Sequence, residues 1–239
     1  RRISKIAAQN FKKLSLEMGG KNPNILFSDT NLKKAVGWAI KASFLNQGQI
    51  CLCGSRLFVQ ESIYNEFKSM FVKGVKKLIV GDPKKNNSFL GAISSKEHMK
   101  SILGKIDFAK KEGGKVLCGG KRMIFTDRLK GGFFIKPTVL EGLSYLSKTN
   151  QEEIFGPVVC LIPFSTEADV IKMANSTKYG LSASIFTENI SRAHRVASKI
   201  QSGVVWINSW LIRDLRIPFG GMKSSGVGRE GGFESLKFF

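Results

Sequence analysis

The stretch 44-FLNQGQICLCGSRLFVQ-60 joins two different sequence patterns, and the join shows how the chain is built. Apolar residues recur at helical spacing over residues 31–46, and an apolar run over residues 57–59 predicts a strand. Between them, an Asn-Gln pair followed by Gly48 lets the chain turn sharply out of the helix. The sequence therefore predicts a helix, a turn and a strand, with Cys51 in the turn.

The same alternation continues along the whole chain. Helices are predicted over residues 31–46, 61–78, 95–112, 166–176 and 191–201. Strands are predicted at the short apolar or β-branched runs 14–16, 24–27, 57–59, 116–118, 134–140, 158–163, 182–186 and 204–207. This alternation favours an α/β layered domain with a mostly parallel sheet. Neither chain end has a cap or a polar tail, so we expect a piece of a longer protein.

The composition is that of an ordinary globular protein and excludes several classes. The chain has 239 residues, of which 42% are hydrophobic and 23% charged. Its four cysteines are too few for a disulfide framework, and only two histidines are present, so we expect no metal site and a reduced, cytoplasmic location. Cys118 and Cys160 are expected to be small buried apolar residues. No apolar run is long enough for a membrane helix, and the basic N-terminal stretch, which lacks an apolar segment, is not expected to be a secretory signal.

The formal net charge of +20 is the most unusual bulk property. Strongly basic proteins often bind nucleic acids. Here the lysines are scattered over the chain in short pairs, without a long basic block or a nucleic-acid-binding motif. We therefore expect a lysine-rich surface with weak, salt-sensitive binding to polyanions and no specific nucleic-acid partner.

Cys51 is a candidate nucleophile. A turn cysteine is useful in catalysis if it is reachable and partly ionised, and free backbone N–H groups beside it can stabilise an oxyanion. The alternative is a buried structural cysteine. Cys53, two residues on, points the same way as Cys51 only if the segment is extended.

Glu17 is the second candidate, within 14-LSLEMGGKNP-23. A carboxylate at the end of a buried strand has a raised pKa, which suits it to general-base work, and Gly19 with the next glycine allows a close backbone approach. The alternative is a surface glutamate on an edge strand, followed by a turn.

Two further stretches carry weaker signals. In 152-EEIFGPVVCLIPF-164, Glu153 could hold a ribose hydroxyl while Phe155 packs on a flat heterocycle; the alternative is a turn that leads into a core strand. The stretch 217-IPFGGMKSSGVGRE-230 is rich in glycine but lacks the context of a phosphate-binding loop.

Taken together, the four stretches resemble signatures of the aldehyde dehydrogenase superfamily, in the family's order and over essentially the whole chain. The resemblance implies Cys51 as nucleophile, Glu17 as general base, and Glu153, Phe155 and Gly19 as contacts of the cofactor NAD, with NADP a less favoured choice. It implies oxidation of a small-molecule aldehyde to a carboxylic acid through a thiohemiacetal and a thioester.

The family fold places a Rossmann-like coenzyme domain before the glutamate motif, and most of that domain is not found in this sequence. The resemblance therefore implies a remnant of the coenzyme domain at residues 1–19, a three-layer catalytic domain at 20–221, and a tail at 222–239 that returns to the coenzyme domain. We expect residues 1–239 alone to show little NAD-dependent turnover, and the complete enzyme to be a homo-oligomer.

The substrate pocket is expected near 204-VVWINSWLIRDLRIPFGG-221. It resembles most the muconic semialdehyde branch of the family, which belongs to tryptophan catabolism, with Trp210, Arg213 and Cys53 lining the pocket. Arg213 or Arg216 could pair with a substrate carboxylate. The alternative is a surface arginine paired with Asp214.

Two other classes remain open from the sequence. One is a cofactor-free esterase or thioesterase that uses Cys51 and Glu17. The other is an inactive form that acts only as a binding or partner subunit.

Overall fold

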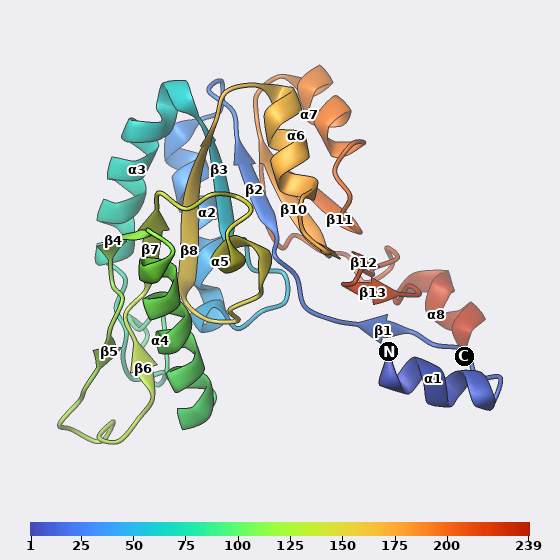
Figure 1. Cartoon of the computed structure of the whole chain (residues 1–239), viewed down its shortest axis with the longest axis horizontal. Helices are drawn as coiled ribbons and strands as arrows, with labels where there is room; N and C mark the ends of the chain where they lie inside the picture. The colour runs from blue at the N-terminus through green and yellow to red at the C-terminus, as the bar shows by residue number, and fades with distance from the viewer.

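A computed structural model describes all of residues 1–239 as a layered α/β body with a projecting arm (Figure 1). The helices are α1 (Arg2–Gln9), α2 (Leu32–Phe44), the 3₁₀ helix η1 (Leu45–Gly48), α3 (Glu61–Lys76), α4 (Lys96–Lys111), α5 (Lys148–Gln151), α6 (Glu167–Asn175), α7 (Ile190–Ala197) and α8 (Gly232–Phe238). The strands are β1 (Leu16–Glu17), β2 (Pro23–Leu26), β3 (Arg56–Gln60), β4 (Lys115–Cys118), β5 (Arg122–Met123), β6 (Phe134–Ile135), β7 (Thr138–Glu141), β8 (Val158–Phe164), β9 (Tyr179–Gly180), β10 (Ser182–Phe186), β11 (Val204–Ile207), β12 (Met222–Lys223) and β13 (Gly226–Val227).

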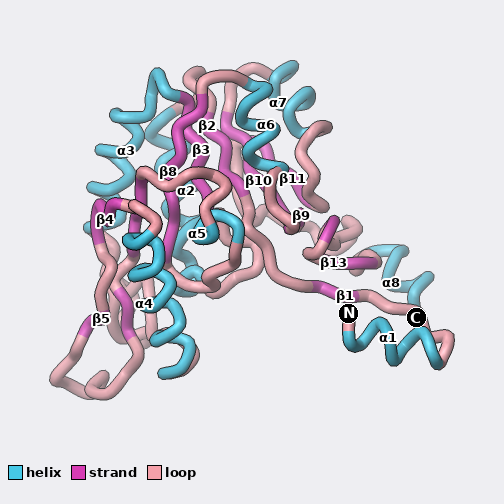
Figure 2. The backbone as a smooth tube through the Cα atoms, viewed as in Figure 1, coloured by secondary structure: helices cyan, strands magenta, loops and turns pink.

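The body is built on one seven-stranded sheet, with the strand order β11-β10-β2-β3-β8-β7-β4. Every neighbouring pair is parallel except β4 with β7, which is antiparallel. The strands gather in the middle of the molecule with helices outside them, as Figure 2 shows. This arrangement confirms the predicted α/β class and the mostly parallel sheet.

Helices cover both faces of the sheet because successive strand side chains point to opposite faces. Leu57 and Val59 of β3 pack with α2 and α3 in one cluster. Phe58, between them, packs with α6 and α7 on the other face. On that second face α4 covers the part of the sheet formed by β7 and β8. The result is a three-layer domain with an apolar core on each side of the sheet.

The arm consists of α1, β1, β13 and α8, and both chain ends lie on it (Figure 1). It is closed by antiparallel pairing of Leu16 with Val227 and of Glu17 with Gly226. Large apolar side chains on the arm are exposed, among them Ile3, Phe11, Phe233 and Leu236. None of the helices of the chain is both long and apolar enough to cross a membrane.

The five predicted helices are all present, although α7 ends at Ala197, four residues earlier than predicted. The predicted strand 134–140 is wrong in part, because it is divided into β6 and β7. Pro137 lies at the division, and a proline has no N–H with which to continue a ladder. β6 pairs with β5, outside the main sheet, while β7 joins β8 within it.

The prediction that Glu17 lies at the end of a buried strand is also wrong. The strand β1 is only two residues long, and Glu17 is exposed on it. The apolar residues beside Glu17 belong to the arm and not to the core of the body, so the sequence run indicated burial that the fold does not provide.

Candidate functional site

The predicted site residues come together because three adjacent parallel strands begin at the same edge of the sheet. Residues 17–22 precede β2, residues 51–54 precede β3, and residues 153–157 precede β8. These strands are neighbours in the order β2-β3-β8, so the segments before them lie side by side. The candidate site therefore lies at the amino ends of the strands.

The Cys51 loop begins with a sharp reversal. The φ angles of Asn46, Gln47 and Gly48 are 50°, 58° and 68°, three successive residues in the left-handed region. For a non-glycine residue this conformation costs about 1–3 kcal/mol. At Gly48 a side chain is also excluded by contact, because an added Cβ would lie 2.2 Å from the carbonyl oxygen of Gly156. The predicted sharp turn is confirmed.

Side-chain hydrogen bonds to residues 91–94 hold the reversed loop in place. The Gln47 side-chain oxygen accepts from the N–H of Gly91 at 2.9 Å, and its amide donates to the carbonyl of Ala92 at 3.3 Å. The Gln49 side-chain oxygen accepts from the N–H of Ser94 at 3.1 Å. These bonds offset the cost of the left-handed residues.

Asn22 fixes the backbone around the nucleophile. Its side-chain amide donates to the carbonyls of Cys51 at 2.7 Å and Cys53 at 2.9 Å, and its side-chain oxygen accepts from the N–H of Ser182 at 3.1 Å. The Trp210 indole N–H donates to the carbonyl between them, that of Leu52, at 2.9 Å. The carbonyls of three successive residues, Cys51, Leu52 and Cys53, are thereby all hydrogen-bonded.

The Cys51 thiol is half-buried and electrostatically disfavoured as an anion. Burial raises its pKa above the ordinary value, and the carboxylates of Glu153 and Glu17 raise it further. The backbone N–H groups of Cys51 and Leu52, which face the sulfur, oppose this shift. No backbone or side-chain oxygen accepts from these two N–H groups, so both can receive an oxyanion.

Glu17 lies near enough to Cys51 for its charge to raise the pKa of the thiol. Although Glu17 is largely exposed, partial burial raises the pKa of its carboxyl group, and the nearby carboxylate of Glu230 raises it further. A backbone hydrogen bond with Gly221 and the charges of Arg229 and Arg213 counteract the shift. The raised pKa makes Glu17 a stronger base than an ordinary surface glutamate.

The double glycine after Glu17 is explained by Glu153. The N–H of Gly20 donates to the Glu153 carboxylate at 3.2 Å, and a Cβ on Gly19 would lie 1.8 Å from the same carboxylate. The close approach predicted at Gly19 is therefore made by Glu153. Burial raises the pKa of Glu153, while the Gly20 N–H and the charges of Lys21 and Lys105 lower it.

Phe155 is presented by a strained backbone. Its φ is 56°, which is uncommon for a bulky residue, and its ring is 40% exposed. The His98 ring nitrogen Nε2 lies 2.6 Å from the Phe155 carbonyl oxygen and holds this turn. A half-buried carboxylate with free acceptor positions beside an exposed ring suits a ribose diol and a flat heterocycle. Glu153 and Phe155 thus fit the nicotinamide riboside end of NAD.

The three predicted substrate residues lie in different surroundings. Cys53 is 7% exposed, burial raises the pKa of its thiol to about 12, and the turn around it means that the segment is not extended. Trp210 is 3% exposed, and its indole N–H stabilises the Cys51 loop by its hydrogen bond to the carbonyl of Leu52. Arg213 is the accessible member, and its guanidinium lies 3.9 Å from the centre of the Phe219 ring. Their substrate roles stay predictions.

The alternative of a surface arginine paired with Asp214 holds for one of the two arginines, but that arginine is not Arg213. Asp214 forms a two-pronged hydrogen-bonded pair with Arg216 instead. The guanidinium of Arg213 lies 3.9 Å from the carboxylate of Glu230, at the limit of an ion pair. Of the two arginines considered for a substrate carboxylate, Arg213 is the one without a close counter-ion.

Sequence reasoning missed the residues that support the site. Asn22, His98 and Lys105 contact the Cys51 loop or the Glu153–Phe155 turn, and Lys105 donates to the carbonyl of Glu153. Their partners lie far away along the chain, so no local spacing marks them. All four cysteines are free thiols, and no group of three metal-ligating side chains lies together.

The fold and the site define an α/β protein with a half-buried thiol near two carboxylates, at the amino ends of parallel strands. The sequence profile of the aldehyde dehydrogenase family matches residues 1–239. The chain belongs to the aldehyde dehydrogenase family.

Several known proteins are similar to this chain in sequence or in structure. The chain is 48% identical to 2-aminomuconic semialdehyde dehydrogenase of Bos taurus, over the whole chain and 49% of that protein. It is 43% identical to 4-trimethylaminobutyraldehyde dehydrogenase A of Danio rerio, over the whole chain and 47% of that protein. A betaine aldehyde dehydrogenase from Staphylococcus aureus, solved with NAD⁺, matches with a TM-score of 0.95 and 41% identity, over 99% of this chain and 46% of that one. The chain spans about half the length of the curated relatives it matches.

Replacing Glu17 by Gln tests whether its charge acts on Cys51. The substitution removes a negative charge near the sulfur, so the pKa of the thiol falls and more thiolate is present at pH 7.5. We expect alkylation of Cys51 by iodoacetamide, followed by mass spectrometry, to become about twofold to fivefold faster, since one pKa unit changes the thiolate population tenfold.

The matched control is Glu66→Gln, which removes an exposed carboxylate from α3. It should leave the alkylation rate of Cys51 unchanged. Equal rates in Glu17→Gln and in the unsubstituted chain would show that the charge of Glu17 does not act on Cys51.

Proposed function

We propose that this chain carries the catalytic machinery for oxidation of an aldehyde to a carboxylic acid, with NAD as the hydride acceptor. The observation that supports this most directly is the setting of Cys51, a half-buried thiol on which the charges of Glu17 and Glu153 act and which two backbone N–H groups face. Family membership and the NAD⁺-bound relative of high structural similarity agree with it.

The first step is attack by Cys51 on the aldehyde carbonyl. The sulfur–carbon bond forms as the carbonyl π bond becomes an oxyanion, which accepts hydrogen bonds from the N–H groups of Cys51 and Leu52. Because the pKa of the thiol is raised, its proton must pass to a base as the bond forms. Glu17 and Glu153 are the two nearby carboxylates that can accept it.

Bound NAD supplies the hydride acceptor that takes this adduct to the thioester. In this chain Glu153 would hold the ribose hydroxyls, and Phe155 would pack against the ring. Gly19 leaves the room for the Glu153 carboxylate, and the N–H of Gly20 donates to it. His98 and Lys105 hold the turn that carries Glu153 and Phe155. These residues would orient the bound cofactor.

Hydrolysis of the thioester is the second half of the reaction. Glu17 accepts a proton from a water molecule while the water oxygen bonds to the carbonyl carbon. The carbon–sulfur bond then breaks, the acid leaves, and the Cys51 thiolate regains a proton. The raised pKa of Glu17 favours this role, because its carboxylate binds a proton more tightly than an ordinary glutamate does.

The arm is proposed to belong with the coenzyme-binding part of the enzyme, and residues 20–221 with the catalytic domain. Residues 1–19 and 222–239 are joined to each other by the pairing of β1 with β13. Their apolar side chains are exposed, with Phe11 at 97% and Phe233 at 77%. Such surface is typical of a contact with another domain or subunit, which agrees with a homo-oligomeric enzyme. Its proposed location is the cytoplasm, where free thiols persist.

An ester assay tests both half-reactions of Cys51 and Glu17 without the cofactor. p-Nitrophenyl acetate should acylate Cys51 with a burst of p-nitrophenolate, followed by slower hydrolysis. We expect Cys51→Ala to abolish both phases. Glu17→Gln should keep the burst and slow the steady state about 100-fold, the size of a general-base contribution.

Cys118→Ala is the control, since it removes another partly exposed thiol and should change neither phase. A burst that survives in Cys51→Ala would rule out Cys51 as the nucleophile. Ester turnover by a complete enzyme that forms no NADH from any aldehyde would favour the cofactor-free esterase instead. Loss of both activities would favour a binding subunit.

The substrate is proposed to be an acid semialdehyde, such as 2-aminomuconic semialdehyde, with Arg213 as the contact of its carboxylate. Arg213 lies near Glu17, whose pKa it lowers, and has only a distant counter-ion in Glu230. The names of several relatives at 41–48% identity agree with this class.

Paired esters test this specificity. Arg213→Gln should slow acylation of Cys51 by p-nitrophenyl hydrogen succinate about tenfold, the cost of losing one charge-assisted hydrogen bond. Acylation by the neutral acetate ester should change less than twofold. Arg216→Gln is the control, because Arg216 is paired with Asp214. Equal losses on both esters in Arg213→Gln would remove the carboxylate role.

A further inference from the structure

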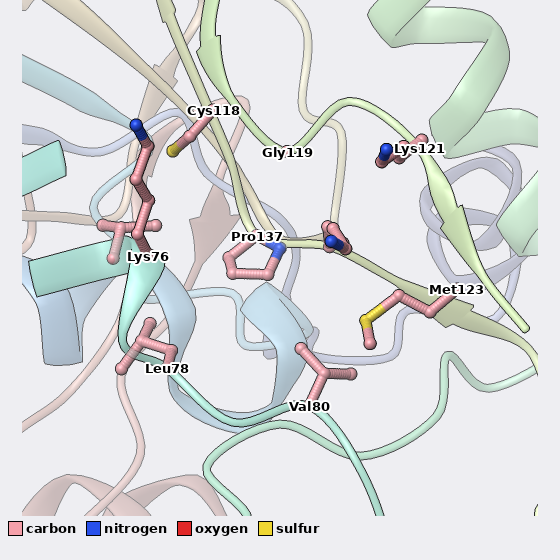
Figure 3. Close-up of a pocket in the computed structure, with 10 residues that line it drawn as sticks. Lys76, Leu78, Val80, Cys118, Gly119, Lys121, Met123 and Pro137 are labelled. Carbon is pink, nitrogen blue, oxygen red and sulfur yellow. The ribbon is translucent and has the colours of Figure 1, made fainter. Parts of the chain in front are cut away.

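A second pocket lies away from the cysteine cleft, between the end of α3, the edge strand β4 and the residues that enter β7 (Figure 3). Its volume is about 410 Å³, within the range of sites for small organic ligands. The lining residues are Val75, Lys76, Leu78, Val80, Cys118, Gly119, Lys121, Met123, Lys136 and Pro137. None of them takes part in the proposed catalytic site.

Three of the residues that line this pocket are lysines without a counter-ion. Lys76, Lys121 and Lys136 are exposed, and none forms an ion pair with a carboxylate. No acidic residue lines the pocket. By contrast, Lys68 on the same helix is paired with Glu141 at 3.0 Å. Lys121 and Lys136 are backbone neighbours, since the N–H of Lys136 donates to the carbonyl of Lys121 at 3.0 Å, and an anion beside their side chains would offset the repulsion between the two charges.

The floor of the pocket is apolar. Val75 and Val80 are buried, at 1% and 8% exposure, and Leu78 and Met123 are partly buried against the same core. Figure 3 shows Lys76 with Cys118 on one side and Lys121 with Met123 on the other, with Pro137 between them. A simple inorganic anion would leave these apolar groups uncovered, whereas a ligand with an apolar body would bury them.

A basic stripe on α3 leads to the pocket. Lys73, Lys76 and Lys77 line an adjoining open hollow that also includes Leu117 of β4, and Lys76 belongs to both. Clustered charge of one sign raises the local concentration of oppositely charged ligands. This stripe gives part of the net charge of +20 a definite location.

We propose that this pocket binds an amphipathic anion, with a carboxylate or phosphate group held by Lys121 and Lys136 and an apolar body against Val80, Leu78 and Met123. The proposal does not depend on the catalytic roles of Cys51 and Glu17. The proposed ligand has an apolar body beside its anionic group, which distinguishes it from a nucleic acid.

Binding of octanoate and octyl phosphate to the purified 239-residue chain tests the proposal, by calorimetry at 150 mM salt. We expect saturable one-to-one binding of at least one probe. Acetate, which has no apolar body, and octylamine, which has the opposite charge, should bind at least tenfold more weakly. The preferred head group then separates the carboxylate class from the phosphate class.

The double variant Lys121→Glu/Lys136→Glu should weaken binding more than tenfold. The matched control is Lys33→Glu/Lys100→Glu, which makes the same charge change at exposed positions of α2 and α4 and should stay within twofold. Equal weakening in both double variants would show diffuse attraction to a basic surface and overturn the proposal. So would absence of saturable binding by both probes.

Cys118 provides a readout that needs no charge variant. Its thiol lines the pocket and lies near Lys76, whose charge lowers its pKa against the raising effect of burial. A bound probe should slow iodoacetamide labelling of Cys118 at least fivefold and leave labelling of Cys51 unchanged. Unchanged labelling of Cys118 at saturating probe would place the bound molecule elsewhere and overturn the proposal.

Discussion

The candidate site depends on one buried side chain, Asn22, which joins three parts of the body. Its amide holds the carbonyls of Cys51 and Cys53, and its oxygen accepts from Ser182 at the start of β10. At 3% exposure it has no water to replace these partners, so losing the donor would leave two buried carbonyls unsatisfied, at about 1–3 kcal/mol each. Asn22 thereby fixes where the thiol lies relative to the sheet edge.

The position of the site follows from the order of the strands whose leading segments Asn22 joins. In open parallel sheets, ligands usually bind at the carboxyl ends of the strands. Here the segments before β2, β3 and β8 carry Asn22, Cys51 and Glu153, and the loop reversal at Gly48 brings the thiol towards the last of these. The arm supplies Glu17 from the other side. The site is thus shared between the sheet edge and a segment that is held by the short pairing of β1 with β13 and by hydrogen bonds of Ser225 to Met18 and Gly19.

The sequence predicted the layered fold well, because an amphipathic period such as that of α3 depends on local spacing alone. It failed where the decisive partner is distant in the chain. Pro137 divides a run that looked like one strand, and Glu17 lies on an exposed strand although its neighbours are apolar. Asn22 could not have been found, since its partners are 29 to 160 positions away. The roles of Cys51, Glu17 and Glu153 came from resemblance to family motifs and stay predictions; the structure brings these groups together.

The most direct test of the role of Asn22 is cysteine labelling of an Asn22→Asp variant. Aspartate has nearly the same shape and still accepts from Ser182, but it cannot donate to the carbonyls of Cys51 and Cys53. We predict that N-ethylmaleimide labels Cys53 at least tenfold faster in native buffer, while Cys160, which is 1% exposed in the sheet, keeps its slow rate. Unchanged labelling of Cys53, or an equal increase at Cys160, would show that Asn22 does not specifically hold the loop of the nucleophile.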